Sequence, residues 1–160
     1  MSFAAAEADR RLADAVRVGT VSRIVGERAV VDFGGAESAE LDVATISAGG
    51  HHVWMQRSVG EQVVVVCPSG DLSQGIVLAS LRSGANAAPS GDPGAYKAVF
   101  ADGTVVEHAG GVTTIECATE VTVKAPLVRV PDGDVVAGSI SLRHHTHSHG
   151  DPAGETAPPS

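Results

Sequence analysis

Short apolar runs separated by turn residues dominate the first half of the chain. Between residues 16 and 82 they alternate with polar positions as strands do, and Gly26-Glu27 and Pro68-Ser69-Gly70-Asp71 punctuate them as turns. The pattern predicts strands at residues 16–21, 29–33, 41–43, 63–67 and 75–79. Several short strands in so little chain favour a closed barrel, because closure removes exposed edges. An OB-type barrel over 17–82 fits the count and the length, and another small barrel is the alternative that spacing alone leaves open.

Two segments flank this predicted barrel. Residues 1–16 predict a short helix, because Ser2 suits an N-cap and Phe3, Leu12 and Val16 can share an apolar stripe. Residues 83–95 are rich in Gly, Pro, Ser and Ala and carry almost nothing to bury, which is typical of a linker.

Residues 96–143 alternate in shorter units, punctuated by Gly and Pro. The predicted strands are 104–107, 112–116, 121–124, 127–130, 135–136 and 140–142. Each offers two or three apolar positions, too few for a stable sheet face within one chain. Such repetition is typical of a solenoid or of an intertwined prism in which further copies supply the core. A two-layer sandwich with the barrel is the alternative.

The composition of the chain limits the kinds of partner and the cellular compartment that we expect for it. The chain has a net charge of −8, and its 11 basic residues form no cluster larger than Arg10-Arg11, so we expect no nucleic-acid partner. Cys67 and Cys117 both lie in strand-like runs and are interpreted as buried free thiols. No apolar run approaches the roughly 20 residues of a membrane span, and the N-terminal charges follow the apolar stretch, so we expect assembly in the cytoplasm.

Residues 143–149 contain a cluster of histidines. It has three interpretations: an expression tag, a metal-binding disordered tail, or a built metal site. In an extended segment His145 and His147, or His147 and His149, project to one side. One chain then supplies two imidazoles, whereas three chains around an axis supply an octahedral set, which suits iron better than tetrahedral zinc.

Three stretches of the chain, residues 58–78, 100–107 and 141–159, resemble the baseplate assembly protein V family, the central spikes of contractile phage tails and R-type bacteriocins. Residues 58–78 resemble the family's barrel signature, and residues 100–107 resemble the opening of its β-helix. Residues 141–159 resemble its apex, with a His-x-His pair, a Gly-rich return and an ending near Pro158-Pro159.

The resemblance implies an all-β homotrimer: an N-terminal OB-fold barrel followed by an intertwined triple-stranded β-helix over 96–143. It also implies an apex over 144–160 in which His-x-His from three subunits binds one iron ion per trimer. Counting back from Pro158 favours His145 and His147.

The function implied is mechanical rather than enzymatic. A virion or tailocin spike would join the baseplate hub through its OB domain and penetrate the target cell's outer membrane. The alternative is an OB-fold module that binds nucleic acid or oligosaccharide and carries a His-rich metal-binding tail. The lack of a basic cluster and of many aromatic residues weighs against it, since aromatics make up only 3% of the chain.

Overall fold

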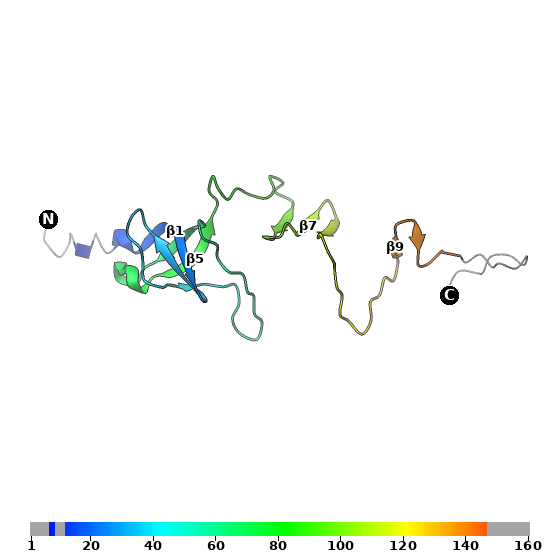
Figure 1. The fold of residues 1–160 in the computed structure, drawn as a ribbon, viewed down its shortest axis with the longest axis horizontal. Coiled ribbons are helices and arrows are strands. Elements are labelled where there is room, and N and C mark those ends of the chain that lie inside the picture. Colours follow the sequence, from blue (N-terminus) through cyan, green and yellow to red (C-terminus); the bar gives the residue numbers. More distant parts are fainter. Residues whose placement is uncertain (1–6, 9–11, 147–160) are drawn as a thin grey trace, which may run out of the picture.

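The computed structural model describes residues 7–8 and 12–146, and its first half is a five-stranded sheet (Figure 1). Its strands are β1 (Val16–Val25), β2 (Arg28–Asp32), β3 (Asp42–Val43), β4 (Gln62–Val66) and β5 (Ile76–Leu81). Two single 3-10 turns, Pro68–Gly70 and Leu72–Gln74, join β4 to β5. Of the predicted N-terminal helix, residues 7–8 and 12–14 are helical, and the other positions lie outside the described residues.

The sheet closes nearly into a barrel. Its strand order is β2-β1-β4-β5-β3, with β3 parallel to β5 and the other pairs antiparallel. Ala29 of β2 and Leu41, just before β3, exchange backbone hydrogen bonds of 3.0 and 2.9 Å, which joins the two edges. The resulting circle of five strands is the arrangement expected of an OB domain, so the all-β barrel is as predicted.

The core of the barrel is small and almost wholly aliphatic. The side chains that face inward are at most 1% exposed: Val21, Ala29, Val31, Leu41, Val63, Val65, Cys67 and Val77. Cys67 is therefore buried as predicted, and its burial raises the pKa of the thiol. Cys117, in contrast, is only partly buried within one chain.

Gly19 allows β1 to lie close to β2. A Cβ atom at this position would lie 2.7 Å from the Asp32 carbonyl oxygen, a backbone atom that cannot swing away. We therefore expect Gly19→Ala to lower the barrel's free energy of unfolding by about 1–3 kcal/mol, as overpacking typically does. Pulsed thiol labelling of Cys67 in urea measures this. Gly49→Ala, where a Cβ meets nothing within 4 Å, is the control, and equal midpoints for the two variants would contradict the close packing.

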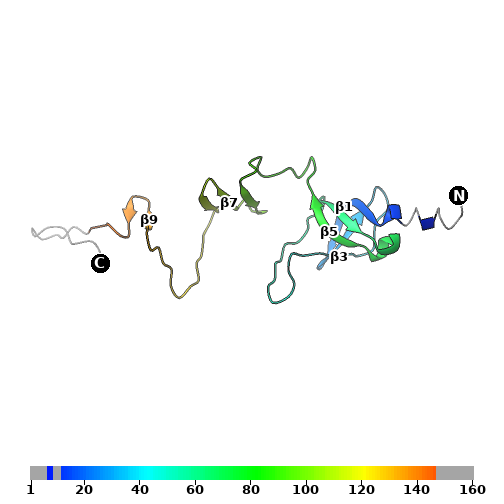
Figure 2. The ribbon, with the colours of Figure 1, turned by 180° about the vertical axis from the view of Figure 1, so that it is seen from behind.

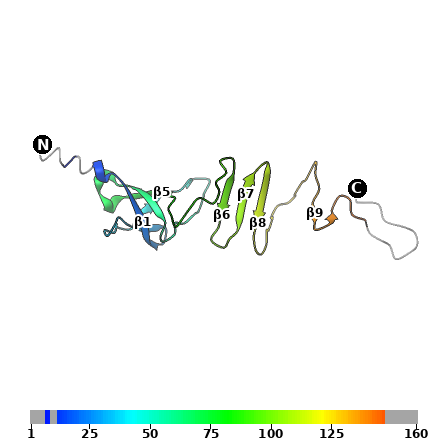
Figure 3. The same cartoon turned by 90° about the horizontal axis from the view of Figure 1, so that it is seen from above.

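Beyond the barrel the chain forms small, separate β units. β6 (Tyr96–Val99), β7 (Val105–Ala109) and β8 (Val112–Glu116) make an antiparallel sheet, and β9 (Val136–Ala137) pairs with β10 (Ile140–Ser141). Figures 1 and 2 place the barrel at one end of the described chain, the β9–β10 hairpin at the other and the β6–β8 sheet between them. Seen from above, β6, β7 and β8 run across the long axis (Figure 3).

The second half differs from the sequence prediction in two places. β6 was not predicted, and the strands predicted at 121–124 and 127–130 do not form within one chain. Residues 117–134 form neither helix nor strand, and their backbone groups share no hydrogen bond with another backbone group of the described chain. None of the described residues from 78 to 146 is buried. A strand needs a partner for its backbone groups, and a single copy offers none here.

Candidate metal centre

The β9–β10 hairpin lies at the far end of the described chain and fixes the positions of the residues around it. Its turn contains Gly138 at a φ of +62°, a left-handed conformation that suits glycine. Ile140 pairs with Ala137 and Ser141 with Val136. The same register brings Asp134 opposite Arg143.

Asp134 holds the two arms of this hairpin together. Its Oδ1 accepts hydrogen bonds from the backbone N–H of Val135 (2.8 Å) and of Arg143 (3.0 Å), and its Oδ2 accepts one from the Ser141 hydroxyl. The Ser141 bond, followed by the two backbone bonds, lowers the pKa of the Asp134 carboxyl below its ordinary value. Because this pKa is lower in the folded hairpin, the ionised carboxylate stabilises the fold at pH values above the ordinary carboxyl pKa. The stabilisation is lost as the pH falls through the pKa of the folded state.

Ser141 links the hairpin to His144 and His145 through hydrogen bonds. Its Oγ accepts the His144 backbone N–H at 2.8 Å. Its carbonyl oxygen accepts the His145 backbone N–H at 3.0 Å and lies 2.8 Å from Nδ1 of the His145 ring. Because a carbonyl oxygen can only accept, Nδ1 carries the proton, and the neutral ring has its lone pair on Nε2. Metal-ligating histidines commonly hold this tautomer through such a carbonyl bond.

The structure tests only part of the predicted ligand set. His145 lies in the described chain, directly after the hairpin, whereas His147 and His149 lie outside the described residues. Within residues 7–8 and 12–146, no three His, Cys, Asp or Glu side chains gather as a metal site would require. The pair of His145 with His147 therefore stays a prediction.

Asp134 and Ser141 were not identified from the sequence. The signal was present in the two-residue turn Gly138-Ser139, which is typical of a tight hairpin and sets the register that brings residue 134 opposite residue 143. Once that register is known, a carboxylate at 134 lies within reach of the chain that leads to the histidines.

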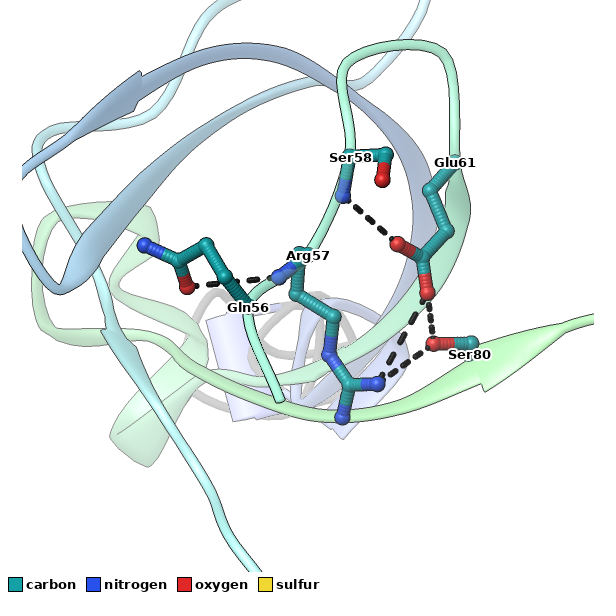
Figure 4. Close-up of polar contacts among 5 residues, drawn as sticks. All are labelled: Gln56, Arg57, Ser58, Glu61 and Ser80. Carbon is teal, nitrogen blue, oxygen red and sulfur yellow. Dashed lines mark hydrogen bonds and ion pairs between the residues drawn. The ribbon is translucent and has the colours of Figure 1, made fainter. Parts of the chain in front are cut away.

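A second polar cluster lies in the barrel (Figure 4). Glu61 accepts the Ser58 backbone N–H at 2.8 Å and the Ser80 hydroxyl, and it forms an ion pair with Arg57 at 3.6 Å. Arg57 Nη1 also donates to Ser80 Oγ at 2.8 Å, and its backbone N–H donates to Gln56 Oε1 at 3.2 Å. The cluster ties the segment before β4 to the end of β5, where the chain leaves the barrel, and thus has a structural role.

Comparison with known proteins places the barrel in a family. Residues 31–81, from β2 to the last residue of β5, match the family of Type VI secretion system/phage-baseplate injector OB domains. The chain is also 31% identical, over 136 residues, to a protein named "Spike protein" from Escherichia phage P2, an alignment that covers 78% of this chain. Residues 31–81 belong to this OB-domain family, and the chain is similar to a phage spike protein.

The two matches support the resemblance seen in the sequence, and the OB-domain match accounts for the near-closed barrel. The chain spans 64% of the length of the phage P2 relative. No helix within the described residues has the length and apolar character needed to cross a membrane.

Proposed function

We propose that this chain is the central spike at the tip of a contractile phage or tailocin tail and works as a homotrimer. Residues 17–82 form an OB-fold collar, residues 83–95 a linker, residues 96–143 a triple-stranded β-helix and residues 144–160 a metal-binding apex. The assembled spike belongs to the baseplate, and its apex leads the tail through the outer membrane of the target cell.

The observation that carries this proposal is that the described second half of the chain leaves apolar side chains exposed and backbone groups without strand partners. Fourteen of its large apolar side chains are between 45% and 67% exposed in a single copy: Tyr96, Val99, Phe100, Val112, Ile115, Val121, Val123, Leu127, Val128, Val130, Val135, Val136, Ile140 and Leu142. The backbone of residues 117–134 also lacks strand partners in the described chain. An exposed apolar surface of this extent marks an interface, and two further copies supply both the core and the missing ladder.

The apex of this trimer holds one iron ion. His145 and His147 from each of three chains give an all-imidazole octahedral set, which suits iron better than zinc. The tautomer of His145, with the Nδ1 proton held by the Ser141 carbonyl, fits a ligand that binds through Nε2. The bound ion ties the three chain ends together at the point of the spike.

The proposed work is mechanical and needs no nucleophile or acid–base pair. Intertwined chains resist axial load because one chain cannot leave without unwinding from the other two. The name of the phage P2 relative, "Spike protein", supports this role. The OB barrel is also compatible with the alternative, a nucleic-acid or oligosaccharide binding module, but the net charge of −8 disfavours a polyanionic ligand.

The mass of the native protein separates these two functions. We expect native mass spectrometry of the full chain to show a trimer carrying one iron ion, because the apolar surface of residues 96–142 requires partners. The same sample denatured in acid gives the chain mass as the control. A metal-free monomer of 16.1 kDa would contradict the spike and favour the binding module.

Attachment to the baseplate hub is assigned to the barrel, because the barrel and the hairpin that precedes the histidines lie at opposite ends of the described chain (Figure 1). Removing residues 1–82 is expected to leave a trimeric needle that no longer joins a baseplate. Purified tails from cells that supply either the truncated or the full-length spike are compared by mass spectrometry. Baseplates that carry the truncated spike at the full-length level would show that attachment lies elsewhere.

A further inference from the structure

We infer that Asp134 and Ser141 are positioning residues that set the ring of His145 for metal binding within each chain, before three chains meet. The inference rests on the metal-binding apex proposed above and adds to it the residues that orient one ligand. They act through His145 and do not themselves touch the ion.

The positioning follows a continuous chain of contacts. The Asp134 carboxylate accepts the Ser141 hydroxyl and the backbone N–H of Arg143, which fixes Ser141 and the residue two positions beyond it. Ser141 then holds the next turn through both of its oxygens: Oγ accepts from the His144 backbone, and the carbonyl accepts from the backbone and Nδ1 of His145. The carboxylate thus reaches the imidazole through one intervening residue.

Packing does not provide this order. β9 and β10 have two residues each, and no residue from 134 to 146 is buried in the single chain. Ile140 and Leu142 are 56% and 54% exposed, so the apolar side chains of the hairpin do not fix its shape there. The order therefore comes from hydrogen bonds: the β9–β10 backbone pairing forms the hairpin, and the contacts of Asp134 and Ser141 extend it to the following histidine.

A fixed ring makes a better ligand in two ways. The carbonyl bond selects the tautomer whose Nε2 carries the lone pair, and it fixes the direction in which that nitrogen points. A ring oriented before binding also loses less rotamer entropy when the metal arrives. Loss of such supporting contacts typically costs about 10–100-fold in metal affinity.

The test uses the full-length chain and Fe²⁺ alone, under anaerobic conditions. Asp134→Ala and Ser141→Ala are expected to lower Fe²⁺ affinity by about 10–100-fold and to reduce the Nδ1-protonated population of His145, seen in the ¹⁵N shifts of the histidine ring. Asp132→Ala is the matched control, because this neighbouring carboxylate makes no such contact in the described chain. Ser141→Thr keeps the hydroxyl and is expected to bind Fe²⁺ with an affinity close to that of the wild type.

The possible outcomes distinguish a failure of the positioning role from a failure of the proposed metal-binding apex. A wild-type trimer that binds no Fe²⁺ overturns the metal-binding apex and the inference with it. A wild-type trimer that binds Fe²⁺, with Asp134→Ala matching Asp132→Ala in affinity and ring signature, overturns the positioning role alone. If Asp134→Ala fails to assemble by native mass, Ser141→Ala against Ser141→Thr decides, and equal affinities overturn the inference.

Discussion

Replacing Val121 and Val123 together by aspartate is expected to leave the chain monomeric. In an extended segment these two residues project to one side, and they are 53% and 67% exposed in a single copy. In the proposed trimer this side faces the other two chains. Each buried valine there contributes about 1.5–3 kcal/mol to assembly. Aspartate removes that contribution and also places carboxylates from three chains close together in an apolar interior, where a charge without a partner is very costly.

The control for this variant lies between the two valines. Thr122 projects to the opposite side of the same extended segment and is exposed, so Thr122→Asp adds a charge without entering the proposed interior. Native mass is expected to show a trimer for Thr122→Asp and a monomer for the double variant, with Val123→Asp alone giving a reduced trimer fraction. A double variant as trimeric as the wild type would exclude residues 121–123 from the interface.

The barrel could be predicted from the sequence because its stabilising contacts lie within one chain. Alternating aliphatic runs specify the strands, and the inward side of each run became the buried core around Val63, Val65 and Val77. Closure between Ala29 and Leu41 follows from the need to pair strand edges. The pattern also signalled that residues 96–143 have too little to bury alone, and the exposed side chains of the single chain agree with that interpretation.

The remaining differences between the predicted and the observed strands arise where the local sequence pattern does not specify which strands pair. β6 follows the linker and has only two strongly apolar residues, Tyr96 and Val99. It forms because β7 offers a partner, with Lys97 and Glu107 joined across the pair at 3.0 Å. The strands predicted at 121–124 and 127–130 have alternating apolar residues but find no strand partner among the described residues of one chain. In the proposed apex, composition pointed to the histidines, whereas the role proposed for Asp134 depends on hairpin register and so required the structure.

His145→Ala combined with His147→Ala is expected to abolish stoichiometric iron while the trimer persists. In the proposed trimer, one ion would stabilise only the end of the spike. The apolar side chains along residues 96–142 would contribute about 25 cal/mol for every Å² that three chains bury. Binding that occurs only in the assembled state does stabilise that state, so a lower thermal midpoint with an unchanged native mass is the expected result. Iron per trimer is measured by elemental analysis of the same fractions.

A matched control is His51→Ala with His52→Ala, which removes two histidines from the barrel loop before β4 and is expected to leave iron unchanged. Iron retained by His145→Ala with His147→Ala would show that the ligands were wrongly chosen. If iron were then lost from His147→Ala with His149→Ala, the second His-x-His pair would be the site. Dissociation of the His145→Ala and His147→Ala trimer would mean something different: the ion, rather than the apolar surface of the β-helix, would be what holds the three chains together.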